Sequence, residues 1–220
     1  MGASQSHSEH QYQELMGKTG FSLEQIKNLH SRFQLLSGNE ETISRENLNS
    51  IPGLAENPIK KQIIEAFFDK RNQHNNETGS YEDIGFEQFL MVMSHFRPPN
   101  PKTKEEEREA IRKEKLHFLF NMHDTDSDGI ITLDEYRKVV EELLSKSGTI
   151  GQDAAKAIAD AAMLEVASTN VPQMGPDDFY EGITFEHFEQ MLQRLELESR
   201  MHIRFLDANT ATMHCGNATM

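Results

Sequence analysis

The sequence predicts an all-α protein built from four helix-loop-helix units in two paired lobes, with short β pairing between the loops of each pair. Three observations support this fold class: one acidic loop with a strict spacing, three weaker copies of the surrounding pattern, and apolar stripes at helical spacing beside the loops. A chain of 220 residues is long enough for two such lobes.

The clearest motif is the segment DTDSDGIITLDE at residues 124–135, which matches D-x-[DN]-x-[DN]-G-x5-E at every specified position. This is the calcium loop of an EF-hand, which binds a hard cation through oxygen ligands. Gly129 supplies the sharp turn at the sixth loop position, and Ile131 at the eighth is expected to form the short strand that pairs this loop with its neighbour. The predicted ligands follow the order of the loop: Asp124, Asp126 and Asp128 through their carboxylates, Ile130 through its carbonyl, Thr132 through a water, and Glu135 through both carboxylate oxygens.

Both flanks of this loop have the apolar spacing of amphipathic helices. The apolar residues before the loop are Leu116, Leu119 and Phe120, and those after it are Tyr136, Val139, Val140 and Leu143. Four acidic side chains within twelve residues repel one another unless a cation neutralises them, which argues against a plain acidic turn. We therefore expect one calcium ion, and we expect magnesium to use the same oxygens at rest.

The three weaker copies keep an apolar β position, at Ile43, Ile84 and Ile183, and an apolar exit helix. At the twelfth loop position, however, they carry Asn47, Gln88 and His187 in place of a glutamate. Loss of the bidentate carboxylate predicts that these loops are metal-free or very weak. Polar inserts at residues 72–80 and 169–178 lengthen two of them and are interpreted as surface excursions.

These patterns divide the chain into five parts: an N-terminal segment at 1–20, an N-terminal EF-hand pair at 21–97, a linker at 98–112, a C-terminal pair at 113–195 and a tail at 196–220. Three prolines near the start of the linker end the preceding helix, and a mixed-charge solvated helix is expected to lead into the third unit. A docking or phosphorylation segment is the alternative interpretation of the linker.

The first residues fit M-G-x-x-x-[ST], the pattern for myristoylation of Gly2, although an ordinary tail is the alternative. A single myristoyl chain binds membranes only marginally, with a constant of about 10⁴ M⁻¹. The sequence has no Lys or Arg before Lys18, so a membrane-bound protein partner is the expected second attachment. The lack of a leader or spanning segment and the single thiol, Cys215, indicate a reducing intracellular compartment.

The charge balance and the missing motifs exclude several function classes. The chain has 22 Lys and Arg against 36 Asp and Glu, a net charge of −14, which disfavours nucleic acid and favours basic helices as partners. No phosphate-binding, nucleophile-elbow or zinc-protease motif occurs, so we expect a protein that is not an enzyme. We expect a monomer with an apolar groove for a partner helix, formed in part by Phe89, Leu90, Val92, Met93 and Phe96. The tail, which includes Met201, would either cover this groove or fray.

Several long stretches make the chain similar to the calcineurin B homologous proteins. They are GKTGFSLEQI, AFFDKRN, FEQFLMVMSHFRP, RKEKLHFLFNMHDTDSDGIITLDEYRKVVEELLS, YEGITFEHF and MHIRFL. The resemblance implies a myristoylated, non-enzymatic EF-hand adaptor that binds the cytoplasmic juxtamembrane helix of plasma-membrane sodium/proton exchangers and promotes their maturation, surface stability and activity. It also implies binding to calcineurin A and inhibition of that phosphatase. We expect the protein in the cytoplasm and at the inner face of the plasma membrane, and a nuclear pool stays open.

Carried over by position, the resemblance assigns calcium to the same loop ligands and the lipid to Gly2. Some family members have a second calcium-binding loop in the C-terminal half; at the last position of that loop this chain has His187. Two other functions stay open: a regulatory subunit or inhibitor of a calcineurin-type phosphatase, and a simple calcium sensor or buffer. The sequence also leaves open whether calcium is required for target binding and which exchanger isoform is bound.

Overall fold

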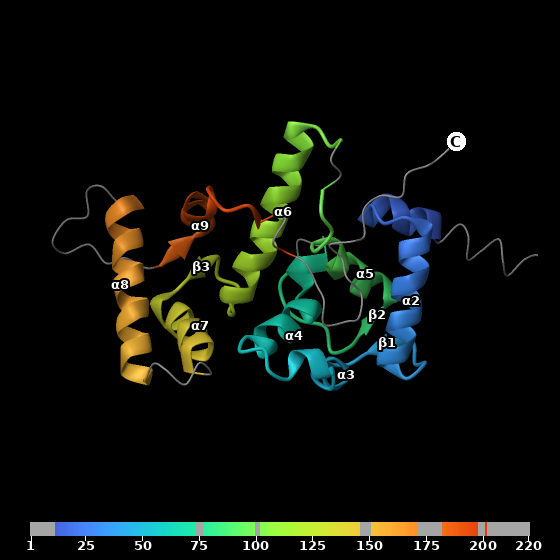
Figure 1. Ribbon diagram of the computed structural model, residues 1–220, viewed down its shortest axis with the longest axis horizontal. Helices are drawn as coiled ribbons and strands as arrows, with labels where there is room; N and C mark the ends of the chain where they lie inside the picture. The colour runs from blue at the N-terminus through green and yellow to red at the C-terminus, as the bar shows by residue number, and fades with distance from the viewer. Residues whose placement is uncertain are drawn as a thin grey trace, which may run out of the picture.

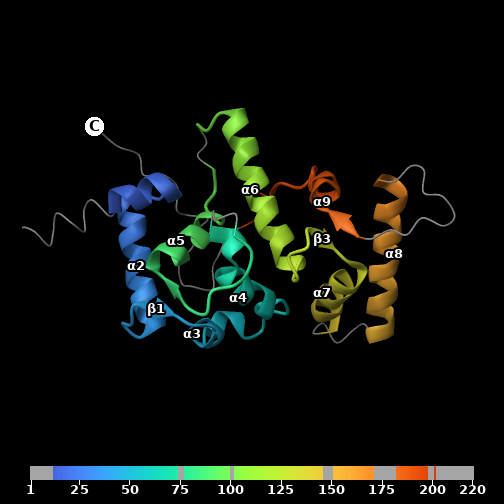
Figure 2. The same cartoon turned by 180° about the vertical axis from the view of Figure 1, so that it is seen from behind.

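The computed structural model describes residues 12–73, 77–99, 102–145, 151–170, 182–197 and 201. Within these residues the chain is mostly helical and forms two halves, each with one short antiparallel sheet (Figure 1). The predicted all-α class with paired helix-loop-helix units is therefore confirmed. Helix α6 lies between the two halves in both face views (Figures 1 and 2).

The N-terminal half begins with a helix over residues 12–19. Its further elements, in order, are α2 (Leu23–Ser37), β1 (Thr42–Ile43), α3 (Arg45–Asn49), η1 (Pro52–Leu54), α4 (Lys60–Phe68), η2 (Lys70–Gln73), β2 (Ile84–Gly85) and α5 (Phe86–Ser94). Local chemistry sets the ends of α2: Ser22 and Gln25 form a reciprocal capping box, and Gly38 ends the helix at φ 67°.

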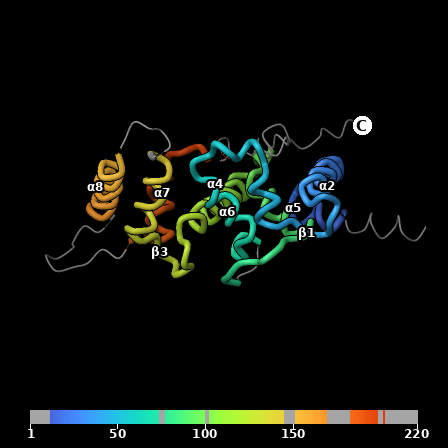
Figure 3. Tube along the Cα trace, turned by 90° about the horizontal axis from the view of Figure 1, so that it is seen from below, coloured from blue at the N-terminus to red at the C-terminus, as the bar shows by residue number. Residues whose placement is uncertain are grey.

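The C-terminal half begins with the shared helix α6. Its elements, in order, are α6 (Glu105–His123), β3 (Ile130–Ile131), α7 (Leu133–Ser145), α8 (Gln152–Asn170), β4 (Ile183–Thr184) and α9 (Phe185–Leu192). Three glutamates in the first turn of α6 complement the positive end of the helix dipole. This helix starts within the segment predicted as a linker with a solvated helix. Seen from below, α7 and α8 lie side by side at the far end of the molecule (Figure 3).

The predicted β positions meet in pairs. Ile43 is the register partner of Ile84, and Ile131 is the partner of Ile183, in antiparallel pairs. All four isoleucine side chains are buried. Loop pairing and core formation therefore use the same residues, because each short strand points one isoleucine into the apolar interior.

Helix α6 contributes side chains to both cores. Phe118 belongs to the buried cluster of the N-terminal half, whereas Leu116 and Phe120 belong to that of the C-terminal half. Residues 116 and 120 lie one turn apart on one face of the helix, and residue 118 lies on the other side. The helix is thus a common wall, and the two halves are joined by packing as well as by the chain.

A buried lysine strengthens this joint. The Nζ of Lys115 donates to the carbonyl of His95 at 2.7 Å and to that of Arg97 at 2.9 Å. Both carbonyls lie just beyond the C-terminal end of α5, where helical carbonyls lack partners within the helix. The ring of His95 also packs on Phe118, with 5.0 Å between the ring centroids. Lys115 therefore fixes the end of α5 against α6.

The interpretation of residues 72–80 as a surface excursion is wrong at its start. Asn72 and Gln73 are buried, and their side-chain amides donate to the carbonyls of Ala66 and Phe67 at 3.0 and 3.1 Å. The reason is that α4 ends inside the protein, where its last carbonyls need donors other than water. Of the second insert, 169–178, the helix α8 includes residues 169 and 170, and residues 171–178 lie outside the described residues.

Candidate metal centre

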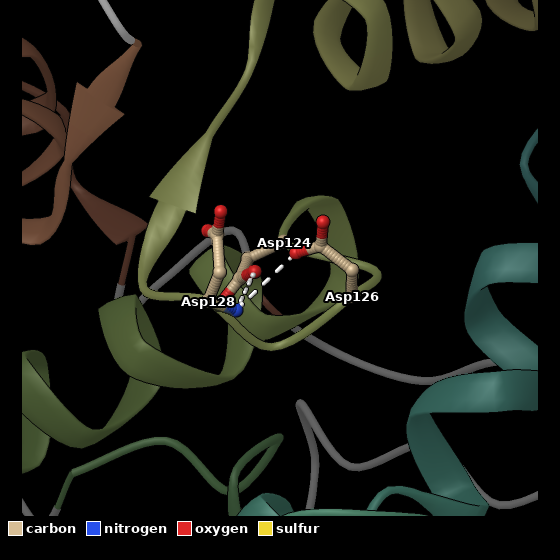
Figure 4. A group of neighbouring side chains, drawn as sticks. All are labelled: Asp124, Asp126 and Asp128. Atoms are coloured by element: carbon tan, nitrogen blue, oxygen red, sulfur yellow. Dashed lines mark hydrogen bonds between the residues drawn. The ribbon is translucent and has the colours of Figure 1, made fainter.

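The predicted calcium loop joins α6 to β3 and α7, and it brings three carboxylates together. Asp124, Asp126 and Asp128 each contribute one carboxylate oxygen, and these three oxygens all lie within 4.8 Å of one another (Figure 4). Asp124 caps the C-terminal end of α6 and is only 1% exposed, whereas the other two are exposed. The arrangement is open to solvent on one side and anchored to the protein on the other.

Backbone amides of the loop turn these carboxylates inward. The amide of Asp128 donates to Asp124 Oδ1 and Asp126 Oδ1, both at 3.2 Å, as the dashed lines in Figure 4 show. The amide of Gly129 donates to Asp124 Oδ2 at 3.3 Å, and the amide of Ile130 donates to Asp128 Oδ1 at 2.8 Å. Gly129 has φ 90°, in the left-handed region that favours glycine, as the motif predicts.

Glu135 is not one of the three carboxylates that converge, and its oxygens accept hydrogen bonds from two threonines. Its Oε1 accepts from the amide and hydroxyl of Thr125 at 2.6 and 2.7 Å, and its Oε2 accepts from the amide and hydroxyl of Thr132, both at 3.0 Å. Burial alone would raise the pKa of Glu135, but these hydrogen bonds outweigh it and lower the pKa. Glu135 is therefore held ionised, and its bidentate ligand role stays a prediction.

The remaining predicted ligands have other contacts in this structure. Ile130 begins β3 and is half-buried, and the hydroxyl of Thr132 is bonded to Glu135. The donors that do converge are all carboxylate oxygens, which suit a hard divalent cation such as calcium or magnesium and not a soft metal. The residues present therefore fit the predicted ion.

Two of the three weaker loops show why their helices persist without an acid at the twelfth position. In the first, Asn47 Oδ1 accepts from the Ser44 amide at 2.8 Å, and in the second, Gln88 Oε1 accepts from the Gly85 amide at 2.9 Å. Glu135 makes the same bond to Thr132. The twelfth residue thus caps the exit helix, a task that a neutral amide performs as well. In the fourth loop the amide of His187 donates to Thr184 Oγ1 at 3.4 Å.

Sequence reasoning missed one residue of the site, Arg71. Its Nη1 donates to Asp124 Oδ2 at 2.7 Å across the two halves. Burial raises the pKa of Asp124, and the charge and hydrogen bond of Arg71 only partly offset that effect. The one sequence signal was a basic residue two positions after Asp69, at the start of a degenerate loop; the contact itself spans 53 positions.

The side chains predicted to line a groove are mostly interior. Phe89, Leu90, Val92 and Met93 are fully buried in the N-terminal core, and Phe96 packs against that core while partly buried. Met201 of the tail belongs to the same buried cluster. Whether these residues contact a partner helix stays a prediction.

Two further predictions concern residues that the structure does not place. Gly2 lies outside the described residues, as does the tail beyond residue 201. In the described part of the chain, no helix combines the length and the apolar character needed to cross a membrane. The predicted domain boundaries likewise stay predictions.

No family model matches the chain. Curated relatives do match it over nearly their whole length. Calcineurin B homologous protein 3 from Homo sapiens is 52% identical over 213 residues, which cover 97% of this chain and 99% of the relative. The protein of that name from Xenopus laevis is 54% identical over 207 residues (94% and 96%), and that from Gallus gallus 48% over 201 residues (91% and 94%). The chain therefore belongs to the calcineurin B homologous proteins.

Proposed function

We propose that this protein is a calcium-binding EF-hand adaptor that acts by binding other proteins and not by catalysis. Calcium binding is supported by one observation: the carboxylates of Asp124, Asp126 and Asp128 converge in a loop whose backbone amides already orient them. On ion binding, the Ile130 carbonyl and Glu135 complete the site, with Thr132 contributing through a water. One ion per chain is expected, with a dissociation constant of roughly 10⁻⁷ to 10⁻⁵ M.

The proposed target is the cytoplasmic juxtamembrane helix of plasma-membrane sodium/proton exchangers. Family membership and the acidic charge of −14 support a basic or amphipathic helix as ligand. The proposed groove includes Phe89, Leu90, Val92, Met93 and Phe96. Because Met201 now packs in that cluster, an incoming helix would replace tail contacts with its own apolar side chains. Binding would shield the exchanger helix and so promote maturation, surface stability and activity.

Myristoylation of Gly2 is proposed to hold the adaptor at the inner face of the plasma membrane, with further pools in the cytoplasm and nucleus. One acyl chain gives marginal membrane affinity, so the exchanger would provide the second attachment. The adaptor is proposed to be a monomer that does not bind nucleic acid. Acylation is tested by the mass of the protein co-expressed with an N-myristoyltransferase; a Gly2→Ala variant is the control that should lack the added mass.

A second candidate function is a regulatory subunit or inhibitor of a calcineurin-type phosphatase. The name of the relatives, which describes homology to calcineurin B, favours it. The third candidate, a plain calcium buffer, needs neither a groove nor a lipid. Calcium-dependent binding of an apolar dye distinguishes a sensor from a buffer. Competition with calcineurin B for calcineurin A tests whether the protein is a phosphatase subunit or inhibitor.

The decisive experiment is a calorimetric titration of the myristoylated protein with a juxtamembrane exchanger peptide, once in calcium and once in chelator. Tight binding in both conditions would indicate a constitutive subunit that calcium modulates, and binding only in calcium would indicate a switch. The Glu135→Gln variant serves as the matched control: it loses a carboxylate ligand but keeps the Arg71 contact to Asp124, so it should behave in calcium as the unchanged protein does in chelator. Absence of binding in both conditions would contradict the exchanger assignment and favour the phosphatase.

A further inference from the structure

Arg71 forms an ion pair at the start of the degenerate second loop. It lies in η2, two residues after Asp69, the acid that leads into that loop. The Arg71 Nε donates to both Asp69 oxygens at 3.1 Å, and Nη2 donates to Asp69 Oδ2 at 2.7 Å. A guanidinium thus neutralises the leading carboxylate of a loop that has lost its glutamate.

The same guanidinium crosses to the competent loop of the other half. Its Nη1 donates to Asp124 Oδ2 at 2.7 Å, and its Nη2 donates to the carbonyls of Asp124 at 2.8 Å and Asn121 at 3.1 Å. The side chain of Arg71 is 15% exposed and that of Asp124 is 2% exposed. One arginine therefore bridges the leading aspartates of two successive loops, in a place where water screens charge weakly.

We propose that Arg71 and calcium compete for Asp124, so that calcium binding loosens the joint between the two halves and the joint in turn limits calcium affinity. The inference rests on the calcium site proposed at residues 124–135. It makes Arg71 a positioning residue that links the ion to the N-terminal half.

Arg71 is expected to weaken calcium binding, and not to strengthen it, because both positive charges would share a single carboxylate. An ion held by Asp124 Oδ1 would lie within a few ångströms of the guanidinium on Oδ2, and repulsion between like charges is strong where both are partly buried. Arg71 could instead favour calcium by orienting Asp124. The amides of Asp128 and Gly129 already do that, so little orientation is lost without Arg71, and repulsion is the larger effect. Linkage then requires the ion to weaken the Arg71 contact by the same factor.

Two further hydrogen bonds cross the boundary between the halves close to Arg71. The Nδ2 of Asn121 donates to Asn72 Oδ1 at 3.0 Å, and Gln62 donates to Glu142 across the same boundary. Beside these contacts lies a cavity of about 560 Å³ whose walls come from both halves. Residues lining it include Lys61, Glu65, Arg71, Asp126, Lys138 and Glu142. A weaker Arg71 contact is expected to widen this cavity.

Calcium calorimetry on the full-length chain tests the proposal without any partner. Arg71→Met keeps the aliphatic stem and removes the charge, and it should bind calcium about tenfold more tightly. Arg45→Met is the matched control. Like Arg71, Arg45 donates to a carboxylate and to carbonyls, but its side chain is 35% exposed and its contacts to Glu65, Tyr81 and Glu82 all lie within the N-terminal half. Its calcium affinity should be unchanged.

The distance between the halves gives a second readout that needs no change at Arg71. Spin labels at the exposed positions Asn49→Cys and Ala157→Cys, in a Cys215→Ser background, report that distance. Calcium should lengthen or broaden the distance distribution. This measurement decides the question if Arg71→Met fails to fold.

Each outcome bears on the inference. Tighter calcium binding by Arg71→Met with an unchanged control, and a longer distance in calcium, would support it. Calcium binding by the unchanged chain with equal or weaker affinity in Arg71→Met, or a distance that stays constant or shortens, would overturn the inference and leave the proposed site standing. If the unchanged chain binds no calcium, the proposed site itself is wrong and the inference falls with it.

Discussion

The two halves share one architecture and differ in how they stabilise it. Among the described residues, the core cluster of the N-terminal half has 20 buried members and that of the C-terminal half has 7. The N-terminal half places neutral caps, Asn47 and Gln88, where the C-terminal half has Glu135 beside three aspartates. The N-terminal half is thus held by apolar packing and neutral caps, whereas the acidic loop of the C-terminal half is expected to gain stability when a cation binds.

The first prediction concerns the packing of the N-terminal half. Phe89→Ala removes a fully buried ring that packs against Phe33 and Phe67, and it should lower the free energy of unfolding by about 3–5 kcal/mol. Chemical denaturation with and without calcium measures this cost, which should be the same in both conditions. The control Leu35→Ala, at a side chain 73% exposed, should change little. A cost that disappeared in calcium would show that the N-terminal half does not stand on its own packing.

The second prediction removes the buried ligand of the C-terminal half. Asp124→Ala should weaken calcium binding by about 100-fold or more and abolish the stabilisation that calcium gives, while the N-terminal core stays folded. Calorimetry and thermal denaturation in calcium and in chelator measure the two effects. Asp83→Ala, at an exposed acid of the second loop, is the control and should bind calcium normally. Tight binding of one ion by Asp124→Ala would show that the ion lies elsewhere.

The third prediction compares two glycines with open surroundings. Gly129 and Gly79 have φ 90° and 107°, and an added Cβ at either would meet nothing within 4 Å. Each change to alanine should therefore cost about 1–2 kcal/mol through backbone strain. Only Gly129→Ala should also weaken calcium binding, by about tenfold, because its amide orients Asp124. Equal calcium affinities of the two variants would contradict the role given to this turn.

The fourth and smallest effect is the pH response of the C-terminal half. Burial, followed by the charge of Lys113, lowers the pKa of His117, and Glu189 and Glu186 offset this only in part. Its ring stacks on Phe185 with 3.5 Å between centroids. Because the folded-state pKa is the lower one, stability present above the ordinary histidine value of about 6.5 should decrease as pH falls through the folded pKa.

His117→Phe keeps a ring at this position and removes the titrating group. Between pH 7 and pH 5 the Tm of the variant should therefore decrease by about 1 °C less than the Tm of the unchanged protein. Thermal denaturation in chelator measures the difference without interference from the calcium loop. Parallel Tm profiles would show that His117 does not contribute.

The sequence was sufficient for features that depend on neighbouring residues. The four isoleucines at the β positions and the aspartates of the loop follow from local spacing, and the structure confirms the pairing of the former and brings the carboxylates of the latter together. The sequence could also have predicted the capping role of Glu135, because Thr132 and Glu135 have the spacing of a capping box.

Features that depend on contacts between distant segments could not be predicted. The bridge from Arg71 to Asp124 and the burial of Lys115 require knowing that α6 packs on both halves. The same holds for Asn72 and Gln73, whose polar side chains resemble those of a surface loop until the end of α4 is found inside the protein. Periodicity likewise predicts the apolar stripe of α5, but it does not predict that Met201 packs in the same cluster.

The most direct test of this account is the stoichiometry of calcium binding to the full-length chain, measured by calorimetry beside the Asp124→Ala variant. We expect one ion per chain, lost in the variant, because only residues 124–135 combine a complete acidic pattern with converging carboxylates in the described structure. Two or more ions per chain, or one ion retained by Asp124→Ala, would show that residues 124–135 are not the single calcium site.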